Sequence, residues 1–174
     1  RIRVVSREWI GRILACLVGA CFVVSAAQAQ PQSGQQANST TFADLVQSAQ
    51  QVMMADPDEA RVRVGNAEGL IASLPPEEQA AGRATVFWLQ SEALTRLGRA
   101  DEAYPVALAA LEELGQQPDV GKLTGDVFTS LGRIEKVMGD HGAALNRYQS
   151  AYEIYREIGE RRSESIALQS MASI

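Results

Sequence analysis

Three sets of small residues recur along this chain with one spacing. They are Ser48, Ala60 and Ala67, then Ser91, Ala103 and Ala110, then Gly132, Ala144 and Ala151. In every set the second residue follows the first by twelve positions, and the third follows the second by seven. Because small side chains let two helices approach closely, this spacing predicts antiparallel helix pairs that repeat along the chain.

The segments around these residues have helical periodicity. Short turns at Gly98 and Gly139, 41 residues apart, each separate two such segments. Upstream, Thr41 is the expected N-cap of a helix to about Met54, and a second helix is expected from Asp58 to Leu74. Its apolar face is formed by Ala60, Val64, Ala67, Ile71 and Leu74. Further helices are expected over 77–97, 100–114, 121–138, 140–158 and 163–174. Apolar and polar residues nowhere alternate as in a strand, so the chain is expected to be all-α.

The first 29 residues have the pattern of a secretory signal peptide. A basic stretch with Arg1, Arg3, Arg7 and Arg12 precedes an apolar run over 13–24, and Ala27-Gln28-Ala29 forms an A-x-A cleavage site. The apolar run is shorter than the roughly 20 residues of a membrane span, so an uncleaved anchor is the weaker alternative. A lipoprotein is a third interpretation, since Cys21 follows Val18-Gly19-Ala20, although apolar residues continue beyond Cys21.

Cleavage after Ala29 would leave an acidic, cysteine-free product. Both cysteines, Cys16 and Cys21, lie in the signal. Removal of four Arg and one Glu leaves 12 basic residues against 20 acidic ones, a net charge of −8. A surface of that sign repels phosphate backbones, so nucleic acid is excluded as a partner. Residues 30–41 are polar and are expected to be a flexible linker to the helical repeat domain, 42–174.

The repeated pairs resemble tetratricopeptide repeats (TPR), in a longer form of about 40 residues. The residues that carry the resemblance are Phe87, Ser91, Gly98, Ala103 and Ala110, and in the next copy Phe128, Gly132, Gly139, Ala144 and Ala151. The resemblance implies an α-α solenoid over about 42–174. Three departures are a period above the usual 34 or so, Asp44 at an apolar position, and Gln51 and Glu135 at positions where the family often has an aromatic residue. A generic alanine-rich bundle is the alternative.

Nothing in the sequence indicates catalysis, a cofactor or a metal site. His141, the one histidine, lies in a turn and is expected to pack there. Glu77-Glu78 and Glu112-Glu113 are adjacent on helices and so point in different directions. Phosphate-binding loops and metal-ligand spacings are absent from the sequence. We therefore expect a non-enzymatic protein.

A binding surface is predicted on the first helix of each pair. Trp88, Glu92, Thr95 and Arg96 share one face, and Thr129, Arg133 and Lys136 lie on it in the next copy. Trp88, Glu92, Arg96, Arg133 and Lys136 are the candidate peptide-binding residues, because an aromatic anchor beside cations suits a peptide carboxylate. The alternative is that Trp88 packs against a neighbouring helix.

The leading functional hypothesis is an exported scaffold that binds protein or peptide segments through its concave face, in the bacterial periplasm or secreted. The alternative is the periplasmic sensory region of a larger membrane signalling protein, such as a diguanylate cyclase or histidine kinase, attached to the membrane through sequence after Ile174. The last segment carries Ile166, Leu168, Met171 and Ile174 with one acidic residue, Glu164. Because a capping helix needs a polar outer face, we expect the solenoid to continue beyond Ile174.

Overall fold

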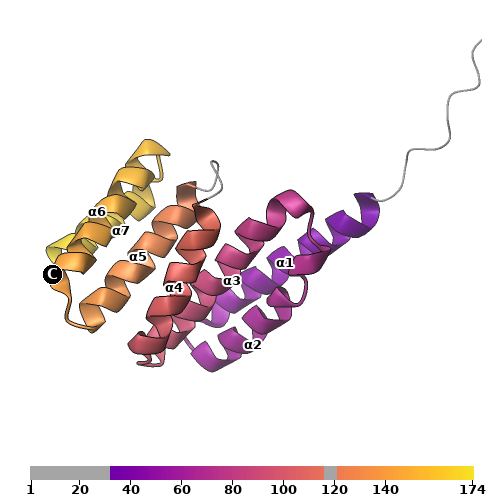
Figure 1. Cartoon of the computed structure of the whole chain (residues 1–174), viewed down its shortest axis with the longest axis horizontal. Helices are drawn as coiled ribbons and strands as arrows, with labels where there is room; N and C mark the ends of the chain where they lie inside the picture. Colours follow the sequence, from indigo (N-terminus) through magenta and orange to yellow (C-terminus); the bar gives the residue numbers. More distant parts are fainter. Residues whose placement is uncertain (1–31, 116–120) are drawn as a thin grey trace, which may run out of the picture. The chain divides into compact units, whose positions relative to one another are not determined.

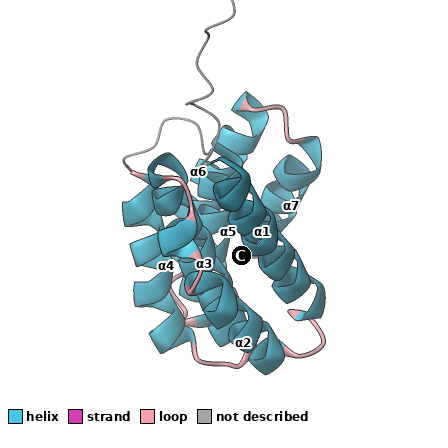
Figure 2. Cartoon of the chain, turned by 90° about the vertical axis from the view of Figure 1, so that its right-hand side faces the viewer, coloured by secondary structure: helices cyan, strands magenta, loops and turns pink. Residues whose placement is uncertain are grey.

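The structure is a computed structural model that describes residues 32–115 and 121–174, with side chains from residue 41 onward in these ranges. It contains seven α-helices and one short 3-10 helix: α1 (Gln32–Val52), α2 (Pro57–Glu68), η1 (Ile71–Ser73), α3 (Pro76–Arg96), α4 (Ala100–Leu114), α5 (Gly121–Val137), α6 (His141–Glu157) and α7 (Arg161–Ala172). Figure 2 shows helices joined by loops, without a strand among the described residues. The all-α prediction is confirmed. The predicted signal peptide lies outside the described residues.

Glycines in the left-handed conformation end three helices. Gly98, Gly139 and Gly159 have φ angles of 76°, 87° and 76°. The amide after each glycine donates to a carbonyl five residues back, as from Arg99 to Leu94 at 2.9 Å. This is the Schellman arrangement, which glycine favours because it has no Cβ to clash at positive φ. The predicted turns at Gly98 and Gly139 are confirmed.

Helices α3 and α4 form one antiparallel pair, and α5 and α6 form the next (Figure 1). Helix α4 packs on α5 between the pairs, and α7 packs on α6. Of the nine small residues in the repeated pattern, eight are buried and Ser48 is half-buried. Ala110 and Ala151 have no exposed surface. The predicted close approach of the helices is therefore confirmed.

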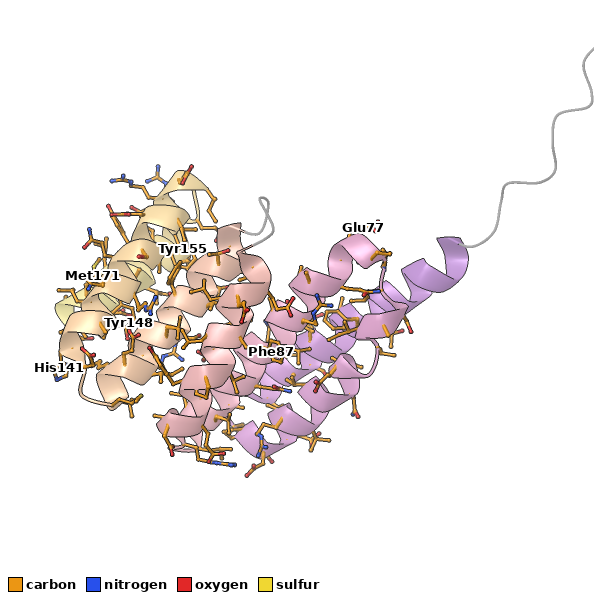
Figure 3. All side chains as sticks on the ribbon, in the orientation of Figure 1. Glu77, Phe87, His141, Tyr148, Tyr155 and Met171 are labelled. Atoms are coloured by element: carbon orange, nitrogen blue, oxygen red, sulfur yellow. The ribbon has the colours of Figure 1, made fainter. Side chains whose placement is uncertain are left out.

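Two glycines on α5 receive two tyrosines from α6. A β-carbon on Gly125 would lie only 2.5 Å from Cε1 of Tyr155. A β-carbon on Gly132 would lie 2.8 Å from Cε1 of Tyr148. The glycines are seven residues apart on α5, and the tyrosines are seven apart on α6. In an antiparallel pair, equal spacing brings both contacts into register. Figure 3 shows the two tyrosines on α6.

Two predicted boundaries are wrong. Helix α1 already begins at Gln32, so Thr41 is not its N-cap and most of the segment expected as a linker is helical. Extending an existing helix adds one backbone hydrogen bond for each residue fixed, so the helix can continue into this polar segment. Helix α2 ends at Glu68 instead of continuing to Leu74. Gly65 and Gly69 weaken the helix there, since glycine costs about 1 kcal/mol relative to alanine.

Ile71 and Leu74 are nevertheless buried, as their periodicity predicted, but they belong to η1 and to the residue that ends it. Residues Ser33 to Ile174 form one compact unit. Within the described ranges, no helix has the length and apolar character needed to cross a membrane.

Candidate functional site

A chain of hydrogen bonds joins the first helices of the two complete pairs. Trp88 Nε1 on α3 donates to Oγ of Ser130 on α5 at 2.9 Å. Ser130 Oγ donates to Oε1 of Glu92, one turn after Trp88, at 2.5 Å. Arg133 Nη1 donates to the other carboxylate oxygen of Glu92, Oε2, also at 2.5 Å. Two side chains from each helix therefore form one polar network between α3 and α5.

The carboxylate of Glu92 is buried and well satisfied. The residue is only 7% exposed. A second guanidinium, that of Arg96, lies 3.5 Å from Oε2. A buried carboxylate is tolerated when cations and hydrogen-bond donors replace its water, and here two arginines and a hydroxyl do so. Glu92 therefore holds Arg133 in place and has no free oxygen to offer a ligand.

A second acidic side chain, Asp126, is held on α5, the helix that carries Ser130 and Arg133. Oδ1 of Asp126 accepts from the Tyr155 hydroxyl at 2.7 Å, and Oδ2 accepts from Lys122 Nζ at 2.8 Å. Tyr155 is 2% exposed. Burial raises the pKa of its phenol well above the ordinary value, so this group is a neutral donor at physiological pH.

A pocket of about 170 Å³ opens between these groups. Its lining comes from four helices: Trp88 and Glu92 of α3, Asp126, Thr129 and Arg133 of α5, Tyr155 of α6, and Ser163 and Ile166 of α7. The Arg133 side chain is 38% exposed, so its guanidinium is partly accessible although one nitrogen is bound to Glu92. We call this the Arg133 pocket.

The described ranges, 41–115 and 121–174, hold no group of three or more His, Cys, Asp or Glu side chains placed to bind a metal ion. His141 is exposed as the first residue of α6 and does not pack in the turn as expected. The cap of α6 is made by Asp140, which accepts from the Ala143 amide at 2.9 Å, so the turn does not need the imidazole.

Comparison with solved structures identifies the architecture. The chain is similar to a TPR-like protein from Chlorobium tepidum TLS, with a TM-score of 0.62 and 24% sequence identity. The match covers 80% of this chain and 98% of that one. The fold is TPR-like. No protein-family model matches the sequence, and no curated protein matches it significantly.

Four of the five predicted binding residues meet in this TPR-like unit. Trp88, Glu92 and Arg133 are joined by hydrogen bonds, and Arg96 contacts the same carboxylate. Lys136 does not join them. Its Nζ donates to the carbonyl and the hydroxyl of Ser173, at 2.8 and 2.9 Å, just after α7. A role in peptide binding stays a prediction for all five.

Sequence reasoning missed Ser130, Asp126, Tyr155 and Ser163. The repeat spacing could have indicated Ser130. It lies 42 residues after Trp88 and 38 after Glu92, and both separations are close to the 41-residue period. A serine in that column of an adjacent first helix is within reach of both side chains. Tyr155 lies on the buried face of α6, and helical periodicity does not show that its hydroxyl binds Asp126 on α5.

Proposed function

We propose that this chain is an exported TPR-like scaffold that binds a segment of another protein in the Arg133 pocket. The observation that carries the proposal is the pattern of hydrogen bonds left available there. Both carboxylates of the pocket already accept bonds from the protein, Glu92 from Ser130 and Arg133, and Asp126 from Tyr155 and Lys122. A cationic ligand therefore meets carboxylates that are already neutralised.

The donors are less fully used. A guanidinium has five N–H groups, and one nitrogen of Arg133 is bound to Glu92. The remaining N–H groups suit an oxygen acceptor, either a carboxylate or a backbone carbonyl. Trp88 and Ile166, which is 46% exposed, supply an apolar wall beside it. Such a pairing of an aromatic and an arginine is typical of protein-binding hot spots.

The size of the pocket favours a peptide side chain over a metabolite. At about 170 Å³ it is smaller than the roughly 300–1,000 Å³ of typical small-molecule sites. One acidic side chain or chain end fits it, with the rest of the peptide lying along α3, α5 and α7. The export part of the proposal rests on the signal-like N-terminal sequence.

A peptide-display selection against the full chain tests the proposal. Wild type should enrich peptides that carry a carboxylate next to an apolar residue. Arg133→Gln should weaken their binding at least tenfold, while Arg61→Gln, which removes an arginine paired with Asp58 on α2, should not. Thermal melts of both variants check that they remain folded. If wild type enriches no peptide, or if both variants bind equally well, the Arg133 pocket is not the binding site.

A further inference from the structure

A second pocket lies on another side of α3. It has a volume of about 330 Å³ and shares no lining residue with the Arg133 pocket. Its lining residues come from the end of α2, from η1 and from α3: Glu68, Ile71, Ala72, Gln79, Arg83, Val86 and Phe87. We call this the Phe87 pocket. Figure 3 labels Phe87 on α3.

The short second helix explains why this pocket exists. Helix α2 has 12 residues, whereas α4 and α6, the second helices of the following pairs, have 15 and 17. The chain leaves α2 at Gly69 and continues as the three-residue η1, which covers less of α3 than another helical turn would. Phe87, which lines this pocket, is only partly buried. The same early end of α2 that broke the predicted helix thus opens a cavity against α3.

Neighbouring aromatic residues on α3 serve the two pockets. Successive residues of an α-helix are about 100° apart around its axis, so Phe87 and Trp88 leave the helix in different directions. Trp88 lines the Arg133 pocket and Phe87 lines the second one. A ligand in one pocket therefore does not occupy the other.

The floor of the Phe87 pocket is apolar. Val86 and Ile71 are 1% and 9% exposed, and the ring of Phe87 and the methyl of Ala72 complete the walls. An apolar cavity of about 150 Å³ is known to be large enough for benzene. A pocket of about 330 Å³ therefore admits a leucine or phenylalanine side chain with part of its backbone.

Besides the carboxylate of Glu68, which accepts from Gln90 Nε2 at 3.2 Å, the rim carries Gln79 and Arg83, one helical turn apart on α3. Gln79 Nε2 donates to the Leu74 carbonyl at 3.0 Å, which fixes the amide and leaves Oε1 as an acceptor. Arg83 Nη2 donates to Glu113 Oε2 at 2.9 Å, and its other N–H groups remain available. A peptide backbone presents both an N–H and a C=O beside each side chain. Gln79 and Arg83 match these two groups.

We propose that the Phe87 pocket binds a leucine-sized apolar side chain of an extended peptide, whose backbone is held by Gln79 and Arg83. The site is separate from the one in the proposed function and does not depend on it. Together the two pockets would let α3 hold two segments of partner chains, one anchored by an acidic group and one by an apolar group.

Methyl NMR on the full chain distinguishes the two pockets, because Ile71 and Val86 report on one and Ile166 on the other. The probes are N-acetyl-leucinamide and, as the matched control, N-acetyl-glycinamide, which has the same backbone groups without the apolar side chain. The leucine compound should shift the Ile71 and Val86 methyl signals saturably, and the glycine compound should bind at least tenfold more weakly.

Filling the pocket should abolish the response. Ala72 is exposed at the pocket wall, so Ala72→Trp, or the smaller Ala72→Leu, should occupy the space without replacing a core residue. Ala55→Trp, at another exposed alanine, is the control. No saturable shift at Ile71 and Val86 in wild type, an unchanged shift in both Ala72 variants, or equal binding of the two compounds would overturn the proposal. None of these results would contradict binding in the Arg133 pocket, which is tested separately with Arg133→Gln.

Discussion

The ring of Tyr148 on α6 lies against the bare Cα of Gly132 on α5. A β-carbon on Gly132 would be 2.8 Å from Cε1 of the ring and 3.1 Å from the carbonyl oxygen of Ala144. The second of these contacts is with backbone, so rotating the tyrosine would not relieve it. Tyr148 is 3% exposed, which leaves the ring little room to move. The distance between α5 and α6 therefore depends on this residue having no side chain.

Gly132→Ala should destabilise the fold, although alanine is the better helix former. Overpacking costs about 1–3 kcal/mol and exceeds the gain in helix propensity, about 1 kcal/mol. Gly65→Ala on α2 is the matched control, because a β-carbon there meets nothing within 4 Å. It should stabilise by roughly 0.5–1 kcal/mol. Urea unfolding measures both, and equal stabilities would contradict the packing at Tyr148.

Removing the charge of Glu92 should destabilise the junction between the pairs. In Glu92→Gln the two arginines lose their buried counter-ion, but both are partly exposed, so the loss is about 1–3 kcal/mol and not the larger cost of a fully buried pair. Glu102→Gln removes an exposed carboxylate paired with Arg99 and should change stability very little. If the two variants unfold at the same urea concentration, the network between α3 and α5 contributes no stability.

Stability should fall at alkaline pH because of the buried tyrosines. Burial raises the pKa of Tyr155 and that of Tyr148 above the ordinary value of about 10. Below that pH both phenols are protonated in the folded and the unfolded chain, and their contribution to the free energy of unfolding is fully present. Above it the unfolded chain releases protons that the folded chain retains, so the free energy of unfolding decreases, for Tyr155 by about 1.4 kcal/mol per pH unit.

Tyr155→Phe should therefore have a free energy of unfolding about 1 kcal/mol lower than wild type near pH 7, because it lacks the hydrogen bond to Asp126. Above about pH 10 its free energy of unfolding should fall less steeply with pH than that of wild type. Tyr104→Phe on α4 serves as the control. Denaturation curves at a series of alkaline pH values give the slopes. An unchanged slope in Tyr155→Phe would mean that this phenol does not resist ionisation in the folded chain.

Export predicts a mature chain that begins at Gln30. The A-x-A site ends at Ala29, so a signal peptidase should cleave after it. Expression in a bacterial host, followed by N-terminal sequencing and intact mass measurement, gives the answer. A membrane-bound product of full mass would contradict cleavage, and a mature start at Cys21 would establish a lipoprotein instead.

Much of the fold could be predicted because its determinants are local and repeated. The glycine turns at Gly98 and Gly139 and the column of small residues have a direct physical cause, which acts in the same way in each copy. The end of α2 was harder. The apolar spacing through Ile71 and Leu74 indicates a continuous helix, while the weak helix formers Gly65 and Gly69 oppose it, and periodicity alone does not show which effect prevails.

The site was predictable only in part. The face that holds Trp88, Glu92 and Arg133 follows from helix geometry, but the direction of a long side chain does not. Lys136 lies one turn from the network, yet its amine is bound to Ser173, far along the sequence. The partner of the flexible Lys136 side chain depends on how α7 packs. The residues around Lys136 in the sequence do not determine that packing.

The hydrogen bonds from Trp88 to Ser130 and from Arg133 to Glu92 also fix the order of the repeats. In most solenoids a repeat contacts only its neighbours, so copies can be inserted or exchanged where interfaces are alike. Here a repeat inserted between α4 and α5 would separate Glu92 from its donors Ser130 and Arg133. The carboxylate of Glu92 would then face a different helix. Any lengthening of this array, in evolution or by design, is therefore easier elsewhere than at the junction of α3 and α5.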